Sequence, residues 1–236
     1  MTATIVLDFD GTIALGAGPL EAFARAVAAA VDEAPFADRA MDAVAAFERG
    51  EVEARDGYDV ISELARRQGV TADVLERAYQ SSRALLGSDH AAIAPPRGLA
   101  DFLIRIGADV RVVLATNAPG AGIRPVLEGW HVADLFDEMH FTVGKPAGLY
   151  PILRAAAADG PVLSVGDIFD FDLAPAAELG AATALVGATA ARSLAATTMR
   201  GRTIADLYGD IEAWAAEAAS STPTRTTLTE RHDPNA

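Results

Sequence analysis

The chain has no cysteine among its 236 residues, which excludes disulfide bonds and thiolate metal sites. It also has no uninterrupted apolar stretch close to the roughly 20 residues that a membrane-spanning helix requires. No charged start followed by an apolar segment indicates a signal peptide. From these absences we expect a cytoplasmic protein without a membrane partner.

Positive charge is scarce as well. The chain carries 19 Lys and Arg residues against 33 Asp and Glu residues, a formal net charge of -14, and this balance opposes binding to a nucleic-acid backbone. Lysine is almost absent, because Lys145 is the single lysine among those 19 basic residues. The length suits one domain with an insertion, and the hydrophobic content of 51% excludes general disorder. We expect a monomer or a homodimer.

The apolar run at residues 4–7 ends abruptly in two carboxylates, Asp8 and Asp10. Such a run is typical of a central parallel strand that is buried on both faces. The alternation of an extended chain places Asp8 and Asp10 on one side and turns Phe9 toward the core. Because ligands bind beyond the carboxyl ends of strands in open α/β sheets, both acids are expected at the mouth of a site.

A carboxylate pair of this kind suits phosphoryl transfer. One carboxylate can attack phosphorus, while the other holds a proton for the leaving oxygen because its charged neighbour raises its pKa. Gly11 permits a bend and close approach of a substrate, and the Thr12 hydroxyl can donate to a phosphate oxygen. From this segment alone, an Asp-rich turn after a strand is the alternative.

A second apolar strand, at residues 111–115, ends in Thr116 and Asn117. The Thr116 hydroxyl and the following backbone amides could bind a phosphoryl oxygen at a helix start, although a simple helix cap would use the same residue types. Lys145 follows in Gly-Lys-Pro, and its compact ammonium is not replaced one for one by the arginine that the chain uses elsewhere.

A third strand, predicted at residues 161–166, is followed by Asp167, Asp170 and Asp172 in one loop. Carboxylates are also common at helix starts, so the loop alone leaves that alternative open. Together with Asp8 and Asp10, however, the loop would form an all-oxygen site, which selects a hard cation such as Mg²⁺.

The ordered set of Asp-x-Asp-Gly-Thr, Thr-Asn, Lys and Gly-Asp resembles the four motifs of the haloacid dehalogenase-like hydrolases, which are mostly magnesium-dependent phosphatases. The resemblance spans residues 4–180. It implies an α/β fold, with a Rossmann-like parallel sheet core (residues 1–15 and 95–219) and an inserted α-helical cap (residues 16–94). The polar residues 220–236 are predicted to form a disordered tail.

Residues 20–90 carry four helical patterns and no strand-like alternation, as a helical cap requires, although a fixed helical layer on the sheet would give the same patterns. The loop between the second and third patterns corresponds to the segment that sorts substrates in the family. Arg49, Arg55 and Tyr58 are therefore the candidates for substrate specificity. The local patterns also place Leu86 in the fourth helix, strands at 139–143 and 202–204, and a closing helix at 206–218.

The resemblance assigns roles to the motif residues. It implies that Asp8 is the nucleophile, that Asp10 is the acid and base, and that Asp172 supports the site by orienting Lys145 or a metal-bound water. The implied ligands of Mg²⁺ are Asp8, the backbone carbonyl of Asp10, and Asp167. The implied phosphate-binding residues are Gly11, Thr12, Thr116, Asn117 and Lys145.

We therefore expect a magnesium-dependent phosphatase that hydrolyses a small phosphorylated metabolite through an aspartyl-phosphate. Dehalogenases of the family lack the second aspartate, which Asp10 supplies here, and its phosphonate hydrolases need a cap lysine, which this cap does not contain. A sugar phosphomutase and a catalytically idle binding or regulatory module remain as alternatives. Many members carry an acidic or amide residue near the position of Leu15, so the sequence does not name the substrate.

Overall fold

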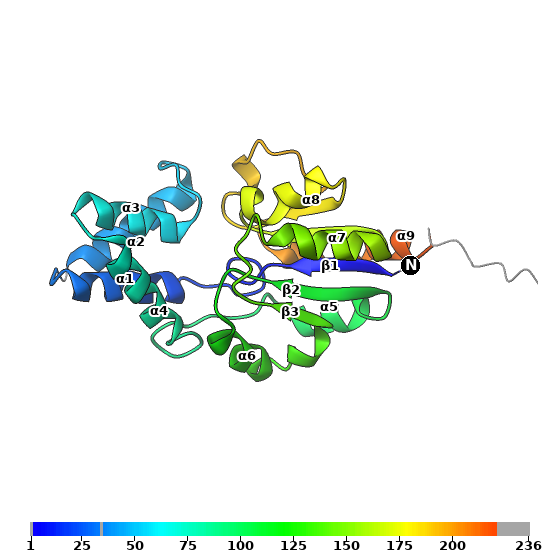
Figure 1. Ribbon diagram of the computed structural model, residues 1–236, viewed down its shortest axis with the longest axis horizontal. Helices are drawn as coiled ribbons and strands as arrows, with labels where there is room; N and C mark the ends of the chain where they lie inside the picture. The colour runs from blue at the N-terminus through cyan, green and yellow to red at the C-terminus, as the bar shows by residue number, and fades with distance from the viewer. Residues whose placement is uncertain (1, 34, 221–236) are drawn as a thin grey trace, which may run out of the picture.

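The computed structural model describes residues 2–33 and 35–220, and in this part of the chain six parallel strands form one sheet (Figure 1). The strand order is β3-β2-β1-β4-β5-β6, so β1 is an inner strand with a partner on each side. The strands are β1 (Ala3–Leu7), β2 (Val110–Ala115), β3 (Glu138–His140), β4 (Val162–Gly166), β5 (Ala182–Leu185) and β6 (Met199–Arg200). The predicted α/β fold with a parallel sheet is confirmed.

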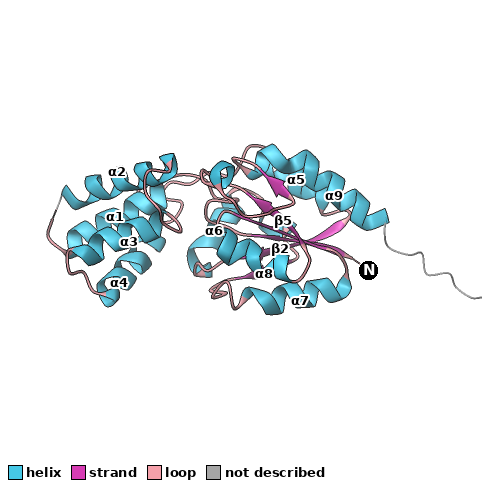
Figure 2. Cartoon of the chain, turned by 90° about the horizontal axis from the view of Figure 1, so that it is seen from above, coloured by secondary structure: helices cyan, strands magenta, loops and turns pink. Residues whose placement is uncertain are grey.

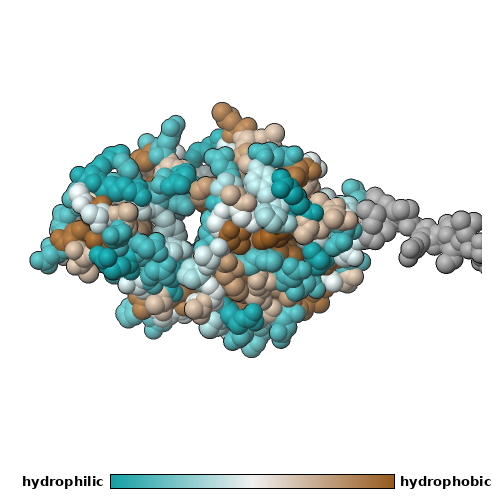
Figure 3. Space-filling view, in the orientation of Figure 1, coloured by the Kyte–Doolittle hydropathy of each residue, from teal (hydrophilic) through white to brown (hydrophobic). Residues whose placement is uncertain are grey.

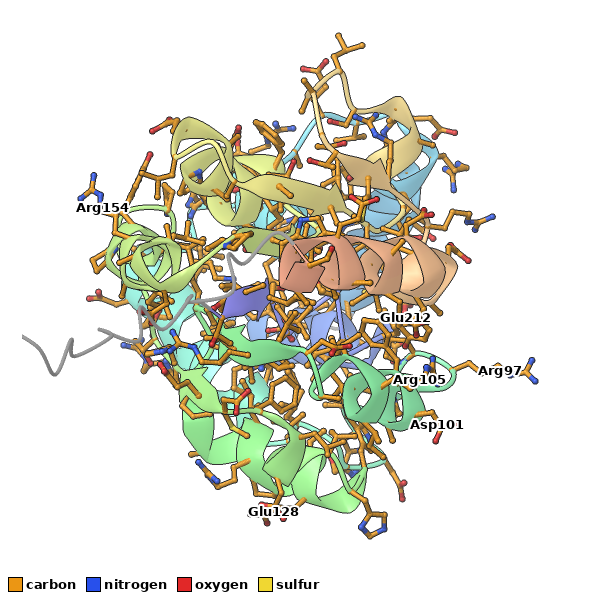
Figure 4. All side chains as sticks on the ribbon, turned by 90° about the vertical axis from the view of Figure 1, so that its right-hand side faces the viewer. Arg97, Asp101, Arg105, Glu128, Arg154 and Glu212 are labelled. Carbon is orange, nitrogen blue, oxygen red and sulfur yellow. The ribbon has the colours of Figure 1, made fainter. Side chains whose placement is uncertain are left out.

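Alternate residues of β1 face different layers of helices (Figure 2). Ile5 and Leu7 pack with residues of α5, α6 and α9, whereas Val6 packs with residues of α7 and α8. On the first face, Arg105 of α5 lies 2.8 Å from Glu212 of α9 between Nη2 and Oε1 (Figure 4). The helices are α5 (Leu99–Ile106), α6 (Gly120–Gly129), α7 (Leu149–Asp159), α8 (Ala174–Glu178) and α9 (Tyr208–Ser220).

The segment between β1 and β2 folds into a helical bundle, which we call the cap (Figures 1 and 2). Its apolar residues, among them Phe23, Phe36 and Ile61, pack against one another in a cluster separate from the two layers of the sheet. The helices therefore form a body of their own and not a layer on the sheet, as predicted for an inserted cap. The cap helices are α1 (Gly18–Ala30), α2 (Pro35–Arg49), α3 (Gly57–Arg67) and α4 (Ala72–Arg83).

Two connections join the cap to the sheet. They run side by side where Leu15 and Ala94 exchange backbone hydrogen bonds of 2.9 and 2.8 Å. The limits 1–15, 16–94 and 95–219 stay predictions. Ser220 still belongs to α9, and the remainder of the expected tail, residues 221–236, lies outside the described residues.

Several local predictions are wrong. Leu86 lies beyond the end of α4 and packs against the apolar cluster of the sheet, not in the cap. Residues 202–204 form no strand, because Thr203 caps a 3-10 helix at Ile204–Leu207; the strand at this edge is β6, a few residues earlier. The strand expected at 139–143 ends at His140, and the closing helix begins at Tyr208.

Within the described residues, no helix has both the length and the apolar character needed to cross a membrane.

Candidate active site

The polar motif residues gather where neighbouring strands end. Asp8 follows β1, Thr116 follows β2 and Asp167 follows β4, and these three strands are adjacent in the sheet. The backbone N–H of Asp8 donates to the carbonyl of Val165 at 3.0 Å, which continues the pairing of β1 and β4 to the last residue. Parallel strands therefore deliver side chains from distant parts of the sequence to one edge.

Lys145 forms ion pairs with two carboxylates at this edge of the sheet. Its Nζ lies 2.6 Å from Oδ1 of Asp8 and 2.7 Å from Oδ1 of Asp172, and its side chain is 3% exposed. Burial opposes the charge, yet the two carboxylates outweigh it and raise the pKa of Lys145. These contacts favour the charged ammonium, which balances the carboxylate of Asp8.

Asp172 is presented by a π-helical turn at Phe169–Leu173, a geometry often found at functional sites. Its Oδ1 accepts from Lys145, and its Oδ2 accepts from the backbone N–H of Ile168 at 3.0 Å. Burial and the neighbouring Asp8 carboxylate raise the pKa of Asp172. Both oxygens are thus occupied in holding Lys145 and the turn. Asp170, two residues earlier, is exposed.

Asp167 lies against the backbone at Gly11. Gly11 has a φ of +76°, and a Cβ placed on it would be 2.3 Å from Oδ2 of Asp167, so this position requires glycine on both counts. Burial raises the pKa of Asp167 well above its ordinary value, and Asp8 adds to the effect. Among the described residues, no side chain or backbone group donates a hydrogen bond to its carboxylate.

Carboxylate oxygens of Asp8, Asp167 and Asp172 lie within 4.8 Å of one another and could hold a metal ion. The cluster has only oxygen donors, and Asp167 is the member that lacks a positive partner within the described residues. These properties fit a hard divalent cation such as Mg²⁺. The Asp10 carboxylate lies outside this cluster, and the backbone carbonyl of Asp10 stays a predicted ligand.

The other predicted phosphate-binding residues occupy distinct places. Thr116 Oγ1 accepts from the N–H of Ala118 at 3.1 Å, which leaves its own hydroxyl hydrogen to donate elsewhere. Asn117 accepts from the N–H of Lys145 at 2.7 Å and keeps its amide hydrogens. Thr12 is fully buried behind the cavity and donates to Oδ2 of Asp8 at 3.3 Å.

A cavity of about 660 Å³ lies between the sheet edge and the cap, where the molecular surface is hollowed (Figure 3). Most of the cap residues that line it are apolar or aromatic, and the predicted residues Arg55 and Tyr58 are among them. Arg49 does not line the cavity and pairs with Glu51 at 2.7 Å. The predicted residues that line the cavity are Asp8, Asp10, Gly11, Arg55, Tyr58, Thr116, Asn117, Lys145, Asp167 and Asp172.

Two arginines that the sequence analysis did not single out connect the cap with the sheet. Arg83 Nη1 lies 2.8 Å from Oδ1 of Asp10. From the sheet side, Arg192 donates to the carbonyls of Phe47 and Glu48 in the cap at 2.5 and 2.8 Å. No pattern in the local sequence could have predicted either contact, because the partners are 73 and about 145 positions apart along the chain.

Several solved structures have a similar architecture. A haloacid dehalogenase-like family hydrolase from Streptococcus pneumoniae superposes with a TM-score of 0.60 at 12% identity, covering 89% of this chain and 98% of that one. YfnB of Bacillus subtilis, described as a HAD-hydrolase bound to magnesium, gives 0.61 at 17% identity, covering 89% and 98%. CbbY of Rhodobacter sphaeroides in complex with phosphate gives 0.57 at 18% identity, covering 84% and 93%.

At these identities, the likeness shows a shared fold. The chain has the fold of the haloacid dehalogenase-like hydrolases, with a helical cap inserted between the first and second strands of a parallel sheet. No protein-family model matches the sequence, and no curated protein matches it.

Proposed function

We propose that the protein is a magnesium-dependent phosphatase of the haloacid dehalogenase-like type, acting on a small phosphorylated metabolite through an aspartyl-phosphate. One observation carries the proposal. Asp8 and Asp10, two residues apart, both line the cavity, but Asp8 is paired with Lys145 and Asp10 is not. Two carboxylates in different surroundings can take different roles at one pH.

Asp8 is the nucleophile in this proposal. The ammonium of Lys145 lies 2.6 Å from Oδ1 of Asp8 and balances the negative charge that the nucleophile brings to the site. One carboxylate oxygen forms the bond to phosphorus as the bond from phosphorus to the leaving oxygen breaks.

Asp10 is the acid and base. Partial burial raises the pKa of Asp10 above its ordinary value, against the opposing effect of Arg83, and this direction favours the protonated form that a general acid requires. It protonates the leaving alcohol and then takes a proton from the water that cleaves the aspartyl-phosphate.

The phosphoryl oxygens are bound by donors whose other bonds are already made. Thr116 offers its hydroxyl hydrogen, Asn117 its amide hydrogens, and Lys145 the third hydrogen of its ammonium. Because these donors are held in place before substrate arrives, little reorganisation is needed during the reaction.

Asp8, Asp167 and the backbone carbonyl of Asp10 would hold Mg²⁺, and Asp172 would act through Lys145 because both of its oxygens are engaged. When bound, Mg²⁺ neutralises the repulsion between the anionic nucleophile and the anionic substrate. The magnesium described for YfnB and the phosphate described for CbbY, two proteins of this fold, support the assignment.

Release of inorganic phosphate tests the proposal. We expect the purified protein to hydrolyse p-nitrophenyl phosphate with Mg²⁺ and to stop when a chelator is added. Asp8→Asn should lower kcat by more than about 10⁴-fold with an unchanged melting temperature, because the amide keeps the shape but is no nucleophile. Asp170→Asn, in the exposed part of the loop, is the matched control and should keep full activity.

The same experiment separates the alternatives. A phosphomutase would move phosphate within a sugar phosphate and release little inorganic phosphate. An idle module would bind phosphorylated ligands without turnover. An Asp8→Asn variant that keeps a few per cent of wild-type activity would rule out the aspartyl-phosphate.

A further inference from the structure

Arg83, the last residue of α4, is buried although it carries a charge. Its side chain is 3% exposed and reaches from the cap to the sheet edge, where Nη1 lies 2.8 Å from Oδ1 of Asp10. Among the ion pairs of the described residues, this one alone joins the cap to the sheet. The cap thus makes direct contact with one of the two carboxylates that carry the proposed chemistry.

The surroundings of Arg83 offer its guanidinium few other hydrogen-bond partners. The Tyr58 hydroxyl lies 3.5 Å from Nη1, and the rings of Tyr58 and Tyr79 pack edge to face nearby with centroids 5.6 Å apart. Nε and Nη2 are buried and have no hydrogen-bond partner within the described residues. An ion pair kept for stability alone would be expected to satisfy these donors, since a buried charge with unmet donors is costly.

The contact with Arg83 makes the two carboxylate oxygens of Asp10 different. Oδ1 is engaged by Arg83, whereas Oδ2 accepts no hydrogen bond from the described residues. The Asp10 side chain remains 32% exposed and lines the cavity. An aspartate without such a partner turns freely about its terminal torsion, which is broad.

We propose that Arg83 is a positioning residue, which holds Asp10 by Oδ1 so that Oδ2 is presented to the leaving oxygen of the substrate. Because Arg83 belongs to the cap, Asp10 is aligned only when the cap sits on the sheet edge as it does here. This inference rests on the proposed phosphatase function. It makes proton donation, and not phosphate binding, the step that depends on the cap.

Leaving groups of different quality provide the test. A nitrophenolate leaves without help, whereas an alkoxide requires a proton from Asp10. Hydrolysis of the aspartyl-phosphate is common to both esters, so the comparison uses kcat/KM, which reports the transfer to Asp8. With Arg83→Met we expect kcat/KM to fall less than about threefold for p-nitrophenyl phosphate and about 30-fold or more for 2-phenylethyl phosphate. Arg77→Met, on the exposed side of the same helix, is the matched control and should change neither value.

A merely structural role predicts equal losses on both esters, and that result, or no loss on either, would overturn the proposal. If Arg83→Met does not fold, Arg83→Lys is measured in the same way, because it keeps the charge and loses the planar fork. We expect a smaller but still selective loss on the alkyl ester, and an equal loss on both esters would again overturn the proposal.

A crystal structure of the Arg83 variant supplies a readout that does not depend on turnover. We expect the Asp10 carboxylate to leave its present orientation or to occupy several. An unchanged, singly ordered Asp10 would overturn the positioning role even if the wild type hydrolysed neither ester. Lack of turnover by the wild type, in contrast, would count against the proposed function itself.

Discussion

On the sheet side of the cavity, Asp8 and Asp172 share the ammonium of Lys145, and Asp167 lies beside them. On the cap side, the lining is mainly apolar and aromatic, with Val44 and Phe47 among its residues. Charges on the sheet side are fixed at strand ends by short, direct contacts, whereas an apolar wall accepts different shapes at similar cost. For the proposed phosphatase, we therefore expect the sheet side to carry the chemistry and the cap side to select the leaving group.

The largest effect that would separate the two sides is expected from Lys145→Arg. The wider guanidinium does not fit between two carboxylates that each lie within 2.7 Å of the ammonium, so kcat should fall about 100-fold. Steady-state phosphate release measures the loss, with Arg97→Lys on the exposed surface as the control (Figure 4). Full activity of Lys145→Arg would show that a general positive charge is enough on the sheet side.

A second prediction concerns the stabilisation by Mg²⁺ and its pH dependence. Burial raises the pKa of Asp167, and it raises that of Asp172 from 3.8 to about 6. Without metal, the folded state therefore holds more protons than the unfolded chain between pH 3.8 and about 6, and its free energy of unfolding falls as the pH rises through this window. A cation competes with these protons, so it should stabilise the fold more at higher pH.

Thermal unfolding with and without Mg²⁺ measures this difference. We expect the increase in melting temperature to be larger at pH 7.5 than at pH 5.5 by roughly 2–4 °C, which corresponds to about 1 kcal/mol. Asp167→Asn should abolish the increase at both pH values. An increase that is equal at the two pH values would mean that the acidic cluster is not where the cation binds.

A smaller effect is expected on the cap side. Arg55→Ala and Tyr58→Ala should each change the ratio of kcat/KM between a bulky and a small aryl phosphate by about 5- to 10-fold, since contacts of one or two groups contribute this much to selection. Arg49→Ala is a matched control at the end of α2, close in sequence to Arg55 and Tyr58, because Arg49 pairs with Glu51 and does not line the cavity. If Arg49→Ala changed this ratio as much as the other two variants, Arg55 and Tyr58 would not be the residues that select the substrate.

The smallest effect is expected at the contact between Arg192 and the cap. Its guanidinium donates to the carbonyls of Phe47 and Glu48 and lies over the Phe47 ring, but most of this contact is exposed to solvent. Arg192→Ala should lower kcat/KM for an alkyl phosphate about threefold, because the cap would leave the sheet more often and Asp10 would then lose its contact with Arg83. Arg154→Ala, on the exposed surface, is the control, and an unchanged kcat/KM for Arg192→Ala would contradict this role.

Much of the sheet side could be predicted from the sequence. The apolar run of β1 and the alternation beyond it place Asp8 and Asp10 at a strand end, and the strand before Asp167 carries the same kind of signal. The predictions for Leu86 and for residues 202–204 were wrong, because one apolar residue after a helix, or one isoleucine after Arg-Thr, does not tell which surface it will contact.

The sequence by itself determined most of the helices and strands and the polar residues that follow the strands, because strand alternation, helical periodicity and turn chemistry are properties of short windows of chain. Only the tertiary structure decided that Arg83 pairs with Asp10, that Arg192 contacts the cap and that Arg49 lies away from the cavity. These contacts depend on how the cap packs against the sheet. Eighteen of the 236 residues are arginine, and no local pattern distinguishes the two that join these parts from those that remain in solvent.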